Sequence, residues 1–142
     1  MTEISIKTQM KVRYAETDQM GVVHHGNYAQ YFEIARLEWL TALGFSYKKM
    51  EEQGVMLPVV SLSTQFKKPA YFDDELTITT TIKQLPNVRI EFCYKIENQN
   101  KELLTTGETV LVFMNSATRK PIKCPENLRN AIEAHLNTTL TP

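Results

Sequence analysis

Apolar and polar residues alternate along most of this chain, and the alternation predicts a sheet of antiparallel strands. From Ile4 to Tyr14, every second side chain lies on one face of the predicted strand, and most of these side chains are apolar. The side chains on the other face are mostly polar. A period of two is that of a half-buried strand. The same period returns in four later segments, at residues 60–67, 76–83, 88–97 and 102–115. Turn-forming residues such as Pro69 and Asn87 separate these segments, so the last three strands are predicted to form an antiparallel meander.

Residues 27–43 break the alternation and predict a long helix. Large apolar residues recur there at helical spacing and form one broad stripe of Tyr28, Tyr31, Phe32, Ala35, Trp39, Ala42 and Leu43. The opposite side also carries apolar residues, at Ile34, Leu37 and Leu40, so the helix is expected to be buried over most of its circumference. Asn27 is the predicted N-cap and Gly44 the predicted C-terminal stop.

The order of these elements predicts the fold class. Shorter helices are expected at residues 46–53 and from Pro125 to His135, and residues 137–142 are expected to form a frayed tail. A single helix this apolar needs a sheet wrapped around it. The prediction is therefore an α+β fold in which an antiparallel sheet wraps around one long central helix, as a single domain over residues 1–142.

Composition and charge narrow the classes of function. The 16 basic side chains equal the 16 acidic ones, which argues against a broad nucleic-acid surface. No signal peptide is expected at the N-terminus. The sequence contains no run of about 18 apolar residues, so no membrane-spanning helix is expected. The two cysteines, Cys93 and Cys124, lack metal or redox spacing, so a cytoplasmic location with reduced thiols is expected.

The candidate chemistry lies in the stretch YAETDQMGVVHHGNY, which joins the first predicted strand to the long helix. Free backbone N–H groups at a helix start, together with the positive end of the helix dipole, suit a developing oxyanion. Asp18 supplies a carboxylate in the same loop, and Gly21 and Gly26 allow close approach of the backbone. An acid beside a helix end that holds an oxyanion is a minimal set for acyl transfer.

This stretch resembles the 4-hydroxybenzoyl-CoA thioesterase family of hotdog-fold proteins, in particular its branch of small acyl-CoA thioesterases associated with Tol–Pal genes. The residues that carry the resemblance are Tyr14, Thr17, Asp18, Gly21, Val23, His25, Asn27, Tyr28, Glu33 and Arg36. The downstream order of strands agrees over about residues 4 to 116. The resemblance implies a hotdog fold and the hydrolysis of an acyl-CoA thioester to free acid and CoA.

The resemblance also implies roles for residues. Asp18 would attack the thioester carbonyl or activate a water, and the backbone N–H of His25 would hold the carbonyl oxygen. Sites of this family lie at a dimer interface, so a homodimer or homotetramer is expected. No cofactor or metal is expected, because CoA is part of the substrate. Catalysis is thus assigned to Asp18 and His25, and contacts with substrate are expected from Tyr14, Gly26, Asn27, Tyr28, Lys67 and Lys68.

Simpler interpretations remain open for several of these residues. Asp18 is a residue type common in turns, and His24 with His25 and Asp18 could instead hold a metal. Adjacent histidines are expected to point apart, which disfavours a metal. Lys67 and Lys68 could bind CoA phosphates or be a solvated pair, and Glu33 and Arg36, three apart, could simply pair. The alternative functions are a hotdog hydratase or dehydratase acting on an acyl thioester, and a non-catalytic acyl-CoA binder.

Overall fold

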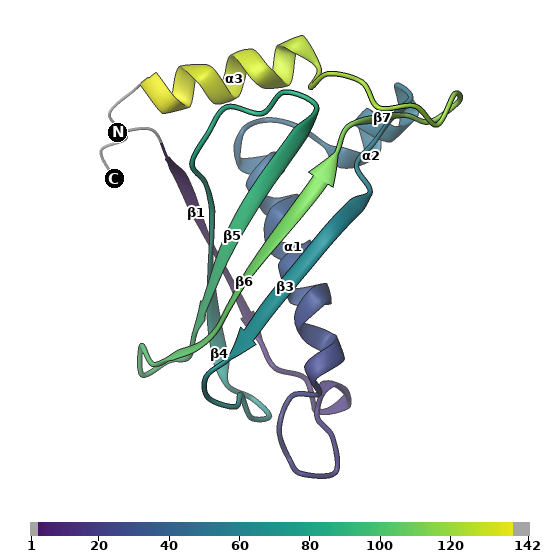
Figure 1. Ribbon diagram of the computed structural model, residues 1–142. Coiled ribbons are helices and arrows are strands. Elements are labelled where there is room, and N and C mark those ends of the chain that lie inside the picture. Colours follow the sequence, from purple (N-terminus) through teal and green to yellow (C-terminus); the bar gives the residue numbers. More distant parts are fainter. Residues whose placement is uncertain (1–2, 138–142) are drawn as a thin grey trace.

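The computed structural model describes residues 3–137, and Figure 1 shows its arrangement. Two short 3₁₀ turns, η1 (Tyr14–Glu16) and η2 (His25–Asn27), lie between the first strand and the long helix. The helices and strands are β1 (Ile4–Lys11), α1 (Tyr28–Ala42), α2 (Tyr47–Glu52), β2 (Val55–Met56), β3 (Val59–Phe66), β4 (Glu75–Ile82), β5 (Arg89–Glu97), β6 (Leu103–Val112), β7 (Met114–Asn115) and α3 (Glu126–Asn137). No helix among the described residues is long and apolar enough to cross a membrane.

Five strands form one antiparallel sheet in the order β1-β4-β5-β6-β3. The five predicted strands and the meander β4-β5-β6 are confirmed. The short pair β2 and β7 was not predicted as separate strands, because two-residue strands carry too few residues to show a period. The α+β hotdog architecture follows: the sheet curves around α1, and α3 crosses one end of the sheet (Figure 1).

Helix α1 packs its aromatic stripe against the inner face of the sheet. Trp39 and Phe32 are fully buried, and the Phe32 ring stacks on Tyr94 of β5 with ring centroids 4.3 Å apart. The predicted stripe is thus the core face of the helix, except for Ala42, which is exposed near the end of the helix. The expectation of burial around most of the circumference was wrong, because Ile34 and Leu37 remain exposed on the far side.

The ends of α1 differ in how well they were predicted. Gly44 has a φ of +89°, the left-handed conformation that glycine adopts without steric cost, so the predicted stop is confirmed. The predicted N-cap was wrong: the Asn27 side chain makes no cap hydrogen bond, and His24 caps the η2 turn that leads into the helix. Helices α2 and α3 match the predicted segments. The predicted tail began one residue too early, because Asn137 is the last residue of α3, and residues 138–142 lie outside the described residues.

Strand β3 is the element whose burial was predicted wrongly. Its alternation predicted one half-buried face, yet in the single chain Val60, Leu62 and Phe66 are 55%, 48% and 55% exposed. The cause is its position, because β3 forms one edge of the sheet and pairs only with β6. An exposed apolar edge strand is a surface that natural proteins usually cover.

Candidate active site

The loop between β1 and α1 is held in a defined shape by its own backbone. The Asp18 N–H donates to the Val22 carbonyl at 2.8 Å, and Thr17 forms a β-bridge with Val23. Gly21, at the tip, has a φ of +82°, a conformation that residues with a side chain rarely adopt. The Val23 N–H donates to the Ala70 carbonyl, which ties the loop to the segment after β3. The loop is therefore a rigid support for Asp18.

The Asp18 carboxylate is half-buried and has one oxygen occupied. Its Oδ1 accepts hydrogen bonds from the backbone N–H groups of Met20, at 2.9 Å, and Val22, at 3.5 Å. These hydrogen bonds are the ones expected if Asp18 were simply a turn residue. Its Oδ2, however, has no hydrogen-bond partner among residues 3–137. The side chain is thus fixed by one oxygen while the other is available for chemistry.

Four backbone N–H groups, those of His24 to Asn27, come just before α1, and three of them have acceptors. The His24 N–H donates to the Glu16 carbonyl, the Gly26 N–H to Nδ1 of His24, and the Asn27 N–H to the His24 carbonyl. Within residues 3–137, the His25 N–H has no such acceptor. This is the donor to which the resemblance assigned the thioester oxygen, and it lies where the helix dipole favours negative charge.

The two adjacent histidines lie together, contrary to the expectation that they point apart. Their rings stack with centroids 4.3 Å apart because η2 turns the backbone between them. Among the described residues, no group of three or more His, Cys, Asp or Glu side chains is placed to hold a metal ion. The His24 ring is used for capping, and the exposed His25 ring lies beside it.

Glu16 is the residue of this region that the sequence did not single out. Its buried carboxylate accepts hydrogen bonds from the Arg13 backbone N–H at 2.8 Å, the Arg13 guanidinium at 3.0 and 3.1 Å, and the Tyr31 hydroxyl at 2.9 Å. Burial alone would raise the pKa of Glu16, but these hydrogen bonds together outweigh it and hold that pKa below its ordinary value. The one available signal was the spacing of Arg13 and Glu16, three residues apart.

The backbone of Glu16 also holds the two sides of the loop together. Its carbonyl accepts from the His24 N–H and from the Asn27 side chain at 2.8 Å. Because Tyr31 belongs to α1, Glu16 links the strand end, the Asp18 loop and the helix. The Asn27 side chain therefore acts in positioning the loop.

The remaining candidate residues differ in burial and in the contacts that they make. Tyr28 is buried and packs on Phe66 with centroids 5.3 Å apart, and burial raises the pKa of its hydroxyl. Tyr14 is 76% exposed, because β1 ends at Lys11 and Tyr14 lies in η1. Lys67 and Lys68 are exposed after β3, and Lys68 forms an ion pair with Glu102 at 3.0 Å.

Comparison with known proteins agrees with this geometry. Residues 12–132 match the family described as the thioesterase-like superfamily. The putative acyl-CoA thioesterase YneP of Bacillus subtilis is 35% identical over 82% of this chain and 85% of its own length. The acyl-CoA thioester hydrolase YbgC of Escherichia coli is 30% identical over 84% of this chain and 89% of its own.

A solved structure of a thioesterase has the same fold as this chain. The DHNA-CoA thioesterase from Staphylococcus aureus superposes with a TM-score of 0.88 at 38% identity, covering 92% of this chain and 90% of that one. The resemblance inferred from the Asp18 loop is therefore confirmed. The chain belongs to the thioesterase-like superfamily with the hotdog fold, and it is an acyl-CoA thioesterase.

Proposed function

We propose that Asp18 is the catalytic carboxylate of this thioesterase and that the His25 backbone N–H holds the thioester oxygen. The observation that carries the proposal is that one loop holds a fixed, half-buried carboxylate and a helix start, each with one polar atom that has no hydrogen-bond partner within residues 3–137. Both belong to one loop that Glu16 ties to α1. Preorganised groups of this kind lower the barrier because they need no rearrangement during the reaction.

Two routes are compatible with this arrangement. In the first, the free oxygen of Asp18 attacks the thioester carbon, the C–S bond breaks, CoA leaves as the thiolate, and water then hydrolyses the acyl–aspartyl anhydride. In the second, Asp18 takes a proton from a water that attacks the same carbon. In both, the carbonyl oxygen gains negative charge facing the His25 N–H. Both consume one water and yield a free acid and CoA.

We infer further that the working unit is a homodimer formed through β3. Val60, Leu62 and Phe66 expose apolar surface along an unpaired strand edge, and Ile34 and Leu37 of α1 expose more. Pairing of two β3 strands about a two-fold axis would cover these residues and extend the sheet across both protomers. A homotetramer would add contacts through another surface.

The substrate class is a small-molecule acyl-CoA. The Staphylococcus aureus neighbour is named for DHNA-CoA, where DHNA denotes 1,4-dihydroxy-2-naphthoyl, and this name supports including aromatic acyl groups among the candidates. Lys67 is our candidate for a CoA phosphate contact, since Lys68 is already paired with Glu102. We propose no cofactor. The free thiols of Cys93 and Cys124 are consistent with the predicted cytoplasmic location.

A panel of acyl-CoAs tests the proposal. Purified protein should release CoA thiol from at least one member of a series running from acetyl through palmitoyl to aromatic acyl groups. A chelator should leave the rate unchanged, because neither route needs a metal. If folded, dimeric protein released no thiol across the panel, the non-catalytic acyl-CoA binder would replace this proposal.

A further inference from the structure

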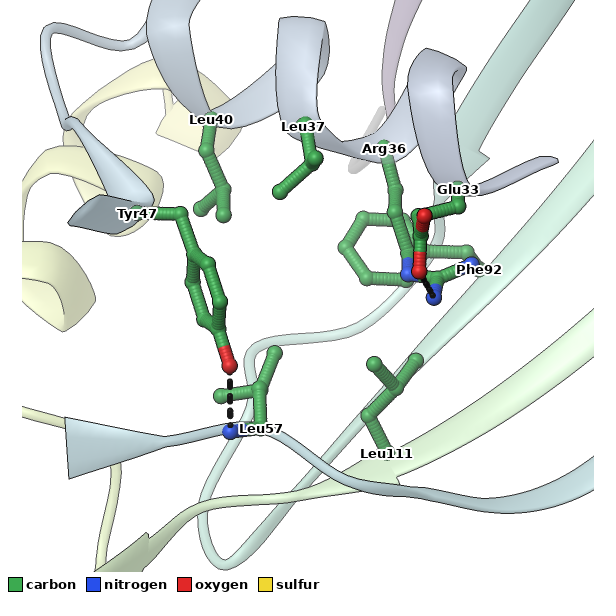
Figure 2. Close-up of a pocket in the computed structure, with 8 residues that line it drawn as sticks. All are labelled: Glu33, Arg36, Leu37, Leu40, Tyr47, Leu57, Phe92 and Leu111. Atoms are coloured by element: carbon green, nitrogen blue, oxygen red, sulfur yellow. Dashed lines mark hydrogen bonds and ion pairs between the residues drawn. The ribbon is translucent and has the colours of Figure 1, made fainter. Parts of the chain in front are cut away.

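A small pocket lies between α1 and the sheet (Figure 2), and none of its lining residues belongs to the Asp18 loop. Its walls are mostly apolar, and its volume is about 90 Å³. The lining residues are Glu33, Arg36, Leu37, Leu40, Tyr47, Leu57, Phe92 and Leu111. A cavity that takes up benzene has a volume of about 150 Å³. The pocket of a single protomer therefore admits only part of an aromatic ring and needs a further wall to enclose one.

Arg36 is the one positively charged residue in this lining. Its side chain is only 11% exposed, and its guanidinium lies 3.7 Å from the carboxylate of Glu33, which is itself largely exposed. Burial raises the pKa of the nearby Tyr94 hydroxyl, and its hydrogen bond with Thr109 and the positive charge of Arg36 act against that rise. A guanidinium carries five N–H donors. Within residues 3–137 the ion pair with Glu33 leaves some of those donors without an acceptor, and Arg36 lines the pocket (Figure 2).

Strand β3 connects this pocket to the reaction site of a second protomer. Its last residue, Phe66, packs against Tyr28 at the start of α1, whereas its first residue, Val59, pairs with Leu111 of the pocket. When two β3 strands pair antiparallel about a two-fold axis, the end of one lies beside the start of the other. The Asp18 loop of one protomer then faces the pocket of its partner, and the partner's surface supplies the missing wall.

We propose that Arg36 is a specificity-determining residue, whose guanidinium donates to a hydroxyl oxygen at the far end of the acyl group. The inference rests on the proposed function, since it places the acyl group of the thioester in this pocket. A hydroxyl suits the pocket better than a carboxylate, because Glu33 lies beside Arg36 and would repel a second anion. The apolar walls would hold the ring, and Arg36 would distinguish acyl groups by their distal oxygen.

A matched pair of substrates tests this inference. We compare kcat/KM for 4-hydroxybenzoyl-CoA and benzoyl-CoA, which differ only in the distal hydroxyl. A hydrogen bond to a charged group predicts that the parent prefers the hydroxylated substrate by about 10- to 100-fold. Arg36→Met, which keeps an apolar stem, should bring the ratio close to one. Arg89→Met, at an exposed arginine of β5, should leave the preference intact.

The outcomes separate this inference from the proposed function. A parent enzyme that hydrolyses both substrates equally, or an Arg36→Met enzyme that loses both rates in proportion, overturns the inference and leaves the thioesterase standing. If Arg36→Met fails to fold by circular dichroism, Arg36→Gln replaces it. That variant keeps a polar side chain but removes the charge that makes the hydrogen bond strong, and an unchanged preference would again overturn the inference. Absence of thiol release from every acyl-CoA would overturn both.

Discussion

Glu16 sits two residues before Asp18, and its environment determines how the loop responds to pH. Its carboxylate is buried with Arg13 and Tyr31, and its pKa lies below the ordinary value because hydrogen bonds to the charged form outweigh the effect of burial. A carboxylate whose folded pKa is below its unfolded pKa stabilises the fold above the unfolded value. That contribution is lost as the pH falls through the folded pKa.

Glu16→Gln should lower the free energy of unfolding at neutral pH by about 1–3 kcal/mol, the range for losing hydrogen bonds to a buried charged group. The difference from the parent should shrink as the pH falls below the ordinary glutamate pKa of about 4.3, because the unfolded parent then takes up a proton at Glu16 before the folded parent does. Urea unfolding at several pH values measures both effects. Glu51→Gln, at an exposed glutamate of α2, should change neither. A destabilisation by Glu16→Gln that does not depend on pH would contradict this account.

At the scale of elements, the contact between α1 and β6 depends on a residue without a side chain. Gly107 of β6 lies under the Phe32 ring, and a methyl group added at this position would meet Cζ and Cε2 of that ring. The space is already filled by the stack of Phe32 on Tyr94. The long helix can therefore approach the sheet closely only because Gly107 is there.

Gly107→Ala should destabilise the protein by about 1–3 kcal/mol, the usual cost of overpacking a filled core. The combined change with Phe32→Leu should recover part of that loss, because the smaller side chain leaves room for the methyl group. Thermal unfolding of the two single variants and the double variant forms the required cycle. Strictly additive losses would show that the Phe32 ring is not what limits the space at Gly107.

The elements also show where sequence patterns carry information. The stripe of α1 and the strands of the meander followed from periodicity, because each has one face in the core of its own chain. The burial of β3 did not follow, since it is an edge strand whose apolar side chains have a neighbouring strand on one side only. At the site, Asp18 was found from motif and residue type. Glu16 was not, because a buried carboxylate depends on Tyr31, fifteen residues away, and no period links the two. The sequence also did not predict that His24 is a cap. The short turn η2 precedes α1, so the capping residue lies three residues before the predicted N-cap, Asn27.

At the scale of the whole molecule, the exposed apolar surface concentrates along β3 and the neighbouring side of α1. The reaction loop lies at one end of β3 and the Arg36 pocket at the other. A monomer leaves both features open to solvent. A two-fold dimer through β3 would cover the apolar edge and place each loop next to the pocket of the other protomer.

Leu62→Lys, near the middle of β3, should convert the dimer into a monomer, because it places a charge in the pairing edge. Light scattering at micromolar concentration measures the mass, and thiol release from the same samples shows whether activity falls with assembly. Gln9→Lys places the same charge on β1, the opposite edge of the sheet, and should leave the dimer intact. A Leu62→Lys protein that stays dimeric, or a monomer that keeps full activity, would count against the shared site.

The central claim, that Asp18 performs the chemistry, is tested most directly by the rate of CoA thiol release from Asp18→Asn. Asn is close in size and can still accept the Met20 N–H, so the fold should be retained, but it offers neither a nucleophile nor a base. The account predicts a fall of about 10²- to 10⁴-fold, or roughly 3–5 kcal/mol of barrier. Asp73→Asn, at an exposed aspartate in the turn before β4, should keep the parent rate. A rate for Asp18→Asn within about tenfold of the parent, a difference of only about 1.4 kcal/mol, would contradict the claim.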